Sequence, residues 1–292
     1  MSDRIAIDTP TVARMVARQF PHWAHLPVTP VERSGWDNHT FHLGPAMKIR
    51  LPSAERYVAQ VEKENRILPL LARQLPLPVP APLGIGRPDA DFPWPWSIQR
   101  WIAGETASRE IIADMARFGH DLGRFLAALQ RVDARDGPPA GAHNFHRGGD
   151  LAVYDAEARR SIAMLGDRID GPAALALWEA ALASRWTEPP VWVHGDIAVG
   201  NLLVREGQLS AVIDFGSCGV GDPACDLVIA WLFLDAPGRA VFRAALPHSA
   251  ATWARARGWA LWKAALVAAQ GQQTHPAESP PLAVIDRLFA ER

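Results

Sequence analysis

The segment of residues 191–216 constrains the fold more than any other part of the chain. Three short apolar runs alternate there with polar residues: the first leads into a His-Gly-Asp motif that ends at Asp196, the second follows Asn201, and the third ends in an Asp-Phe-Gly motif that begins at Asp214. Short apolar runs joined by a polar turn are typical of strands in a hairpin. A hairpin after the first loop would bring the three polar side chains to one edge.

These side chains supply two carboxylates and one amide oxygen, which are ligand types that Mg²⁺ prefers. Phosphoryl transfer asks a protein mainly for positioning, for metal neutralisation of charge, and for one base near the attacking hydroxyl. We therefore interpret Asp196 as a candidate catalytic base, and Asn201 and Asp214 as candidate magnesium ligands. Each motif recurs by chance on its own, but the ordered combination indicates a kinase.

The sequence resembles the aminoglycoside phosphotransferase family, within the wider group that shares the protein-kinase-like fold. The resemblance rests on the His-Gly-Asp motif with Asn201, on Ile-Asp-Phe-Gly, and on Gly-Asp-Pro-Ala-Cys-Asp-Leu at residues 221–227. It implies a two-lobed α+β fold: a small sheet-bearing nucleotide-binding lobe, residues 1–102, and a larger, mainly helical catalytic and substrate-binding lobe, residues 103–292. It implies the same base and metal ligands as above, and no long regulated activation segment after Asp-Phe-Gly.

Three further residues near the motifs are interpreted as structural. Asp222 is followed by a proline, and this pair is typical of a helix cap and a first helical residue. Asp226 falls one turn further on. His194 could act as a general base, but the resemblance makes it a residue that braces the loop. We expect all three to anchor the catalytic loop rather than to contact a substrate.

A second candidate group lies in the N-terminal part of the chain. The strand-like run 47–51 carries Lys48 and Arg50, which strand alternation places on one face. The helix that follows carries Glu62 and Glu64. In kinases a strand cation pairs with a helix glutamate and reaches the phosphates. By the resemblance, Arg50 with Glu64 fits best; Lys48 as the phosphate contact, or a solvated surface strand, are the alternatives.

Two more segments are candidates for nucleotide contact. Residues 33–38 would form a loop over the phosphates, with Ser34 and Gly35 as contacts, although the chain has no glycine-rich fingerprint there and no Walker-type motif. Arg100 and Ile102 lie where the family's interlobe hinge would be, so the resemblance implies main-chain bonds to the base. Because side chains say little about main-chain bonds, the choice between ATP and GTP stays open.

Periodic patterns place these motifs within secondary structure. The chain is expected to begin with a helix that is capped by Thr9 and has Pro10 at its first position. The strands are predicted near residues 40–43, 47–51, 93–101 and 191–215, and the helices near residues 54–75, 109–132, 153–165, 172–185 and over most of 223–292.

Composition narrows the class of partner. The chain has 292 residues and a formal net charge of −1, so no basic field is present to attract nucleic acid or an anionic membrane. No apolar run is long enough for a transmembrane helix, and no signal-peptide pattern occurs. Cys218 and Cys225 are expected to be reduced thiols. We therefore predict a cytoplasmic monomer or homodimer that acts on a small molecule.

The acceptor is the least constrained part of the prediction. A polycationic aminoglycoside needs a pocket lined with carboxylates, and acidic residues after the catalytic motifs are few. Tryptophans in the C-terminal helices are expected to be mainly core residues. The resemblance nevertheless favours an aminoglycoside-type acceptor, with ATP or GTP and Mg²⁺ as cofactors. The alternatives are a kinase of a macrolide-like or metabolic alcohol, and a catalytically silent nucleotide-binding protein. A protein kinase is disfavoured because no Ala-Pro-Glu motif follows.

Overall fold

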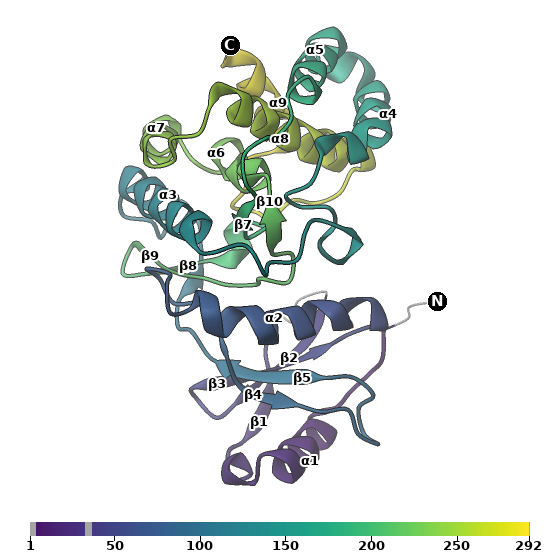
Figure 1. Cartoon of the computed structure of the whole chain (residues 1–292), viewed down its shortest axis with the longest axis vertical. Helices are drawn as coiled ribbons and strands as arrows, with labels where there is room; N and C mark the ends of the chain where they lie inside the picture. Colours follow the sequence, from purple (N-terminus) through teal and green to yellow (C-terminus); the bar gives the residue numbers. More distant parts are fainter. Residues whose placement is uncertain (1–3, 33–36, 292) are drawn as a thin grey trace. The chain divides into compact units, whose positions relative to one another are not determined.

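The computed structural model describes residues 4–32 and 37–291. The chain forms two compact units, residues 1–103 and residues 104–292 (Figure 1). Within the described residues, the first unit carries a five-stranded sheet, and the second is mainly helical with a three-stranded and a two-stranded sheet. This confirms the α+β fold class that was expected from the sequence.

The sheet of the first unit is antiparallel throughout, in the order β1-β2-β3-β5-β4. A hairpin joins β2 to β3 at Gly44, whose φ of 58° lies in the left-handed region that glycine adopts without strain. The elements of this unit are α1 (Thr9–Gln19), η1 (Pro21–Trp23), β1 (Val28–Pro30), β2 (Asn38–Leu43), β3 (Met47–Pro52), η2 (Glu55–Tyr57), α2 (Val58–Leu71), β4 (Pro82–Gly86) and β5 (Trp96–Arg100).

The two faces of this sheet differ in chemistry. α1 covers one face, where Met15 joins Ile49 and Ile98 in a buried apolar cluster. α2 lies on the opposite face (Figure 1). Because side chains alternate along a strand, this second face receives the neighbours of those strand residues, among them Arg50 and Gln99, which are also buried. The sheet therefore has an apolar side, which forms the core, and a polar side beneath α2.

Two predicted helix starts in the first unit need correction. Asp8, not Thr9, caps α1: its backbone is extended, and its side chain accepts a hydrogen bond of 2.9 Å from the amide of Thr11. An aspartate followed by a threonine offers two good caps in a row, so the local sequence does not choose between them. α2 begins at Val58 rather than near residue 54, because a 3₁₀ turn precedes it.

In the second unit, α8 (Ala250–Gln270) contacts α4, α5, α9 and η7, whereas α3 packs against α7. α3 starts later than predicted because the side chain of Asp114 caps it. The other elements are β6 (Glu105–Thr106), α3 (Met115–Arg131), η3 (Ala142–Asn144), η4 (Leu151–Tyr154), α4 (Asp155–Leu165), η5 (Gly166–Arg168), α5 (Gly171–Leu182), β7 (Val191–Val193), η6 (Val199–Asn201), β8 (Leu202–Arg205), β9 (Gln208–Val212), β10 (Gly219–Gly221), η7 (Pro223–Val228), α6 (Ile229–Leu232), α7 (Ala236–Ala245) and α9 (Pro281–Ala290).

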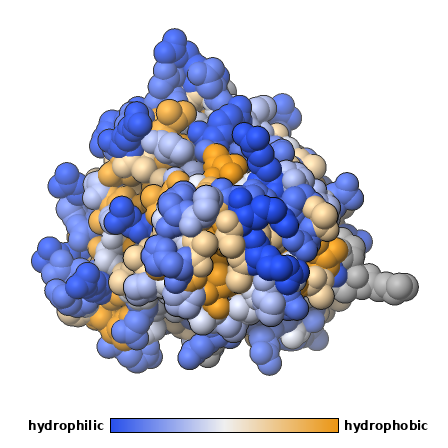
Figure 2. Space-filling view, turned by 90° about the horizontal axis from the view of Figure 1, so that it is seen from below, coloured by the Kyte–Doolittle hydropathy of each residue, from blue (hydrophilic) through white to orange (hydrophobic). Residues whose placement is uncertain are grey.

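None of the described helices combines the length and the apolar character needed to cross a bilayer. Figure 2 shows one face of the molecule, on which hydrophobic residues form separate small patches among hydrophilic ones. Scattered exposed apolar residues of this kind are normal on protein surfaces.

Candidate functional site

The loop after β7 is anchored by a buried carboxylate. Asp226, in η7, accepts a hydrogen bond of 2.7 Å from the amide of His194 and one of 2.8 Å from the amide of Gly195. Asp226 has no exposed surface, and its burial raises the pKa of its carboxyl, while His194 and the two amides oppose this shift. Both oxygens are used by the backbone, so Asp226 shapes the loop and does not face a substrate.

The ring of His194 links the two polar motifs. Its Nδ1 accepts a hydrogen bond of 3.2 Å from the amide of Asp196, so the ring proton lies on Nε2, which donates to the carbonyl of Ile213 at 3.0 Å. The ring also packs against Phe215, with 4.5 Å between ring centroids. Because both ring nitrogens are bound to the backbone, His194 has no nitrogen left to act as a base.

Asp196 and Asn201 are in direct contact. The amide Nδ2 of Asn201 donates to both the backbone carbonyl and the carboxylate Oδ2 of Asp196, each at 2.9 Å. Among the described residues, no group donates to the other carboxylate oxygen of Asp196, which lies on an exposed residue. One oxygen is therefore held in place while the other can accept a proton.

Asp214 is brought to the same place by the second hairpin. The amide of Ile213 donates to the carbonyl of Asn201 at 2.9 Å, which puts the residue before Asp214 against Asn201. Asp214 itself has a φ of 63°, an uncommon value for a residue with a side chain. Such backbone strain is concentrated at functional sites. The hairpin therefore brings together the three residues that the sequence analysis selected.

Gly195 shows why the loop needs a glycine. Its φ is 83°, in the left-handed region. A Cβ added there would also collide with the carbonyl oxygen of Ser217 and meet the Cβ of Arg147. The loop is thus packed tightly against the chain that follows Asp-Phe-Gly, and a larger residue would push Asp196 out of place.

The oxygen atoms near Asn201 fit a divalent cation. The Nδ2 of Asn201 is occupied by Asp196, so its Oδ1 points elsewhere, and none of the described residues donates a hydrogen bond to it. Asp214 follows Ile213, whose amide bonds to the carbonyl of Asn201, and supplies a carboxylate in the same segment. Magnesium that arrives with a nucleotide needs only one or two protein oxygens, because phosphates and water supply the rest. The described residues offer no closed cage of three or more His, Cys, Asp or Glu side chains, and such a cage is not required.

In the first unit, Arg50 and Glu64 form a buried ion pair. Nη1 of Arg50 donates to both carboxylate oxygens of Glu64 at 2.9 Å, and the two residues are 6% and 2% exposed. This burial rules out a solvated surface strand. Lys48 lies on the same face of β3 but is only partly buried, and Glu62 is exposed. The structure therefore pairs the strand arginine with the helix glutamate.

Gln99 was missed by the sequence analysis. It lies on the polar face of the sheet, is 1% exposed, and donates from Nε2 to the hydroxyl of Ser97 at 3.2 Å. Its Oε1 is buried without a hydrogen-bond partner among the described residues. A buried acceptor left unpaired costs free energy unless a ligand satisfies it. The available signal was strand alternation: Gln99 follows the apolar Ile98 and therefore falls on the opposite face of β5, where it lies across from Lys48.

The other candidate nucleotide contacts are less informative. Arg100 ends β5 as an exposed residue and pairs with Met47, and Ile102 follows in the connecting segment. The amide of Trp101, which lies between them, donates to the carbonyl of Ala46 at 2.8 Å. The other two candidates, Ser34 and Gly35, lie outside the described residues.

A pocket opens beside Asp196 in the second unit. Its cavity volume is about 40 Å³, and it is lined by the loop after β7, by η7 and by α8. Two cationic and two aromatic side chains are among its lining residues: Arg147, Lys263, Trp259 and Trp262. Sequence analysis did not select these four residues, because they come from a loop and a helix far from the motifs. Trp259 and Trp262 are buried, as was expected of tryptophans in these helices. Both also line the pocket.

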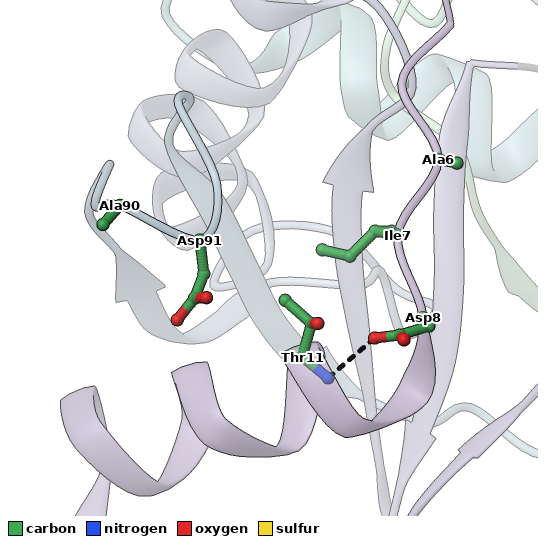
Figure 3. Close-up of a pocket in the computed structure, with 6 residues that line it drawn as sticks. All are labelled: Ala6, Ile7, Asp8, Thr11, Ala90 and Asp91. Carbon is green, nitrogen blue, oxygen red and sulfur yellow. Dashed lines mark hydrogen bonds between the residues drawn. The ribbon is translucent and has the colours of Figure 1, made fainter.

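A second hollow lies in the first unit, between the start of α1 and residues 90–91 (Figure 3). Its two carboxylates serve the local structure. Asp8 caps the helix, as the dashed bond to Thr11 in Figure 3 shows. Asp91 pairs with Arg14 at 3.3 Å and with Arg18 at 2.9 Å. We assign no chemistry to this hollow.

Comparison with known proteins places the chain among phosphotransferases. A model described as the phosphotransferase enzyme family matches residues 28–259. Over 67 residues the chain is 37% identical to an aminoglycoside 3'-phosphotransferase of Escherichia coli. This shorter match spans 23% of the chain and only 25% of that relative's length.

Two solved structures are similar over almost the whole chain. The GDP complex of wild-type aminoglycoside 2'-phosphotransferase-IIIa has a TM-score of 0.67 at 17% identity, over 97% of this chain and 99% of that one. The macrolide 2'-phosphotransferase apoenzyme of Brachybacterium faecium has a TM-score of 0.59 at 23% identity, over 96% of each chain. Identities this low show the fold alone, and they confirm the predicted protein-kinase-like fold.

Proposed function

Because the chain belongs to the phosphotransferase enzyme family, we propose that it transfers the γ-phosphoryl group of ATP or GTP to a hydroxyl group of a small molecule. The observation that carries the proposal is the hydrogen-bonded convergence of Asp196, Asn201 and the segment that ends in Asp214. This arrangement supplies a base and oxygen ligands at one place, as phosphoryl transfer requires.

The proposed roles follow from the contacts. Asp196, oriented by Asn201, accepts the proton of the acceptor hydroxyl through its unpaired oxygen. The hydroxyl oxygen then bonds to the γ-phosphorus, while the bond from that phosphorus to the bridging oxygen breaks and leaves a nucleoside diphosphate. Asn201 and Asp214 would hold Mg²⁺. Neutralisation of phosphate charge is the chemistry that a bound Mg²⁺ supplies.

Nucleotide binding is assigned to the first unit, and catalysis and acceptor binding to the second. Arg50, held by Glu64, is the proposed phosphate contact, with Lys48 as the alternative. The polar face that also carries Gln99 supports this assignment, because buried polar groups without protein partners are expected where a polar ligand binds. Main-chain groups near Arg100 remain the proposed contact for the base.

The acceptor proposed from the sequence was of the aminoglycoside type. Names of relatives support it, since both an aminoglycoside 3'-phosphotransferase and aminoglycoside 2'-phosphotransferases resemble this chain. A macrolide phosphotransferase does so as well, and it supports the alternative. The activities in these names belong to those proteins. The charges around the pocket beside Asp196 bear on the choice directly, and they favour a different class of acceptor.

The central test replaces the proposed base. Asp196→Ala is expected to lower the rate of phosphoryl transfer by about 10²- to 10⁴-fold, the usual contribution of a general base, while the Kd for ATP or GTP stays the same. Transfer would be measured with γ-labelled ATP and GTP on a panel of aminoglycosides, macrolides and metabolic alcohols. Hydrolysis of the nucleotide without an acceptor provides a second readout.

Asp167→Ala is the matched control, because Asp167 is an exposed aspartate of the same unit outside the polar motifs. It should leave both readouts unchanged. Full turnover in Asp196→Ala would refute the assignment of the base. A wild-type protein that binds nucleotide but neither hydrolyses nor transfers it would instead support the silent nucleotide-binding alternative.

A further inference from the structure

Arg147 gives the pocket beside Asp196 an unusual cationic wall. Its guanidinium carbon lies 5.1 Å from the ring centre of Trp259 and 4.9 Å from that of Trp262. These distances are typical of cation–π contacts. The stem of Arg147 lies against Gly195 of the catalytic loop. A positive charge is therefore held at the place where an acceptor for Asp196 would enter.

The loop that presents Arg147 is well defined. Asn144 is fully buried, accepts a hydrogen bond of 3.0 Å from the amide of Gly141, and donates one of 2.9 Å to the carbonyl of Arg147. The two residues between them, Phe145 and His146, both have a φ of 53°. Strained residues persist only where the surroundings over-determine them. The position of Arg147 is thus part of the fold.

The charges nearby do not neutralise Arg147. Among the residues that the structure describes, no carboxylate forms an ion pair with its guanidinium. Glu157 accepts a hydrogen bond of 2.7 Å from the indole of Trp262, and Glu278 is 3.5 Å from the ammonium of Lys263. The acidic groups close to the pocket are therefore engaged, apart from the proposed base. Lys263 is paired with Glu278, so Arg147 is the lining cation that, among the described residues, has no carboxylate bound to it.

The aromatic rings near Arg147 suggest an alternative, a cationic acceptor bound in an aromatic cage, which the geometry disfavours. Tyr154 packs on Trp262 with 4.2 Å between ring centroids, and Trp259 lies 5.6 Å from each of them. Three rings of this kind can form a cage for a quaternary ammonium group. Arg147, however, already stands over both indole faces. A cationic acceptor would have to displace it and would meet its charge.

We infer that this pocket takes a hydroxylated acid: a small acceptor with an anionic oxygen group, carboxylate or phosphate, that binds Arg147, and an apolar body that packs against the parts of Trp259 and Trp262 that line the pocket. Arginine presents a fork of donors that matches such a group in two places. The inference rests on the proposed function for the identity of the pocket as the acceptor site. It departs from the polycationic acceptor that was expected from the sequence.

The test uses probes of one shape and different charge, with the full-length protein. They are 4-(hydroxymethyl)benzoate, its amide and 4-(hydroxymethyl)benzylamine; hydroxymethylphenyl phosphate separates phosphate from carboxylate, and choline and kanamycin represent cationic acceptors. Phosphorylation is followed with γ-labelled ATP, and the equilibrium Kd of each probe is measured by calorimetry without turnover. The kcat/KM and the affinity for the benzoate should each be about tenfold or more higher than those for the benzylamine. This ratio corresponds to the free energy of one charge-assisted hydrogen bond.

Arg147→Gln should bring this ratio close to one, and Arg147→Glu should invert it. A ratio between two probes is not changed by a general loss of active protein. Arg124→Gln, which removes an exposed arginine of α3, is the matched control and should keep the wild-type ratio. A preference of the wild type for benzylamine, choline or kanamycin would overturn the inference, and so would a ratio that Arg147→Gln leaves unchanged.

Failure of this inference can be distinguished from failure of the proposed function. If no probe is phosphorylated, the Kd values decide: affinity for the benzoate or the phosphate that depends on Arg147 supports the inference, and equal affinity for all charges overturns it. Absence of both transfer and nucleotide hydrolysis would count against the proposed function, whichever probe binds.

Discussion

Each unit buries an arginine–carboxylate pair, and the surroundings of the two pairs differ. In the first unit the side chains of Arg50 and Glu64 are 8% and 3% exposed, and in the second those of Arg255 and Asp222 are 5% and 6% exposed. Burial therefore does not distinguish them. Both should be costly to break, because a buried charge that loses its partner is strongly destabilising.

The difference lies in what else surrounds the arginine. Arg255 donates to Asp222 through two nitrogens, at 2.6 and 3.3 Å, and also to the hydroxyls of Ser184 at 3.0 Å and Thr252 at 3.2 Å. Each of the three guanidinium nitrogens of Arg255 therefore donates to a protein oxygen, as expected of an ion pair with a structural role. The polar face that carries Arg50 also includes a buried acceptor without a hydrogen-bond partner among the described residues, the Oε1 of Gln99. A buried ion pair by itself identifies neither role; its neighbours do.

The largest expected effect comes from the structural pair. Arg255→Leu should lower the free energy of unfolding by about 3–5 kcal/mol, because it leaves the carboxylate of Asp222 buried without a counter-charge. Urea denaturation measures this, and the Kd for nucleotide, determined below the transition, should not change.

Arg185→Leu is the control, because Arg185 and Asp150 form an exposed pair at 4.0 Å with side chains 81% and 57% exposed. It should cost less than about 1 kcal/mol. Equal losses in the two variants would mean that burial of the Arg255 pair has no energetic consequence.

The next largest effect is on nucleotide affinity, which should depend on the Arg50 pair and not on the Arg255 pair. Arg50→Met should raise the Kd for ATP by about tenfold or more, as expected for the loss of one charge-assisted hydrogen bond, in addition to lowering stability. Arg50→Lys should recover much of the affinity. Titration of folded protein with ATP measures this.

Lys48→Met serves as the comparison, since Lys48 lies on the same face of β3, and it should change the Kd for ATP less than Arg50→Met does. A larger effect of Lys48→Met would transfer the phosphate contact to Lys48. If neither variant changed the Kd, the Arg50 pair would be structural like its counterpart, and the comparison would fail.

The smallest effect concerns pH and the neighbourhood of Asp222. Burial lowers the pKa of His248 below its usual value of 6.5, with Asp222 opposing the shift and Arg255 adding to it. The unfolded chain then binds a proton more readily than the folded one, so this contribution to stability is intact above pH 6.5 and is lost as the pH falls through the folded pKa.

His248→Leu should therefore reduce the loss of stability on acidification, which urea denaturation between about pH 7.5 and pH 5 can measure. The buried Nε2 of His248 has no hydrogen-bond partner among the described residues, so its removal strands no protein group. An identical acid loss in the variant would show that another group is responsible.

The proximity of Asp196, Asn201 and the segment that ends in Asp214 could be predicted because they lie in one continuous segment. Asp196, Asn201 and Asp214 are joined by short strands, and local patterns fix which way a hairpin turns. The N-cap of α1 was wrong because Asp8 and Thr9 both satisfy the local rule, and only the backbone angles choose between them. Errors of this size change the length of a helix and leave its position intact.

By itself, the sequence determined the α+β class and the polar motifs, since each depends on the order and spacing of nearby residues. The kinase-like fold followed from the family resemblance that those motifs carry. The tertiary structure alone decided the charge of the pocket beside Asp196. Arg147, Trp259 and Lys263 come from a loop and a helix more than a hundred residues apart in the chain, and no local pattern states that they meet. Packing places them together, and with them the chemistry that the acceptor meets.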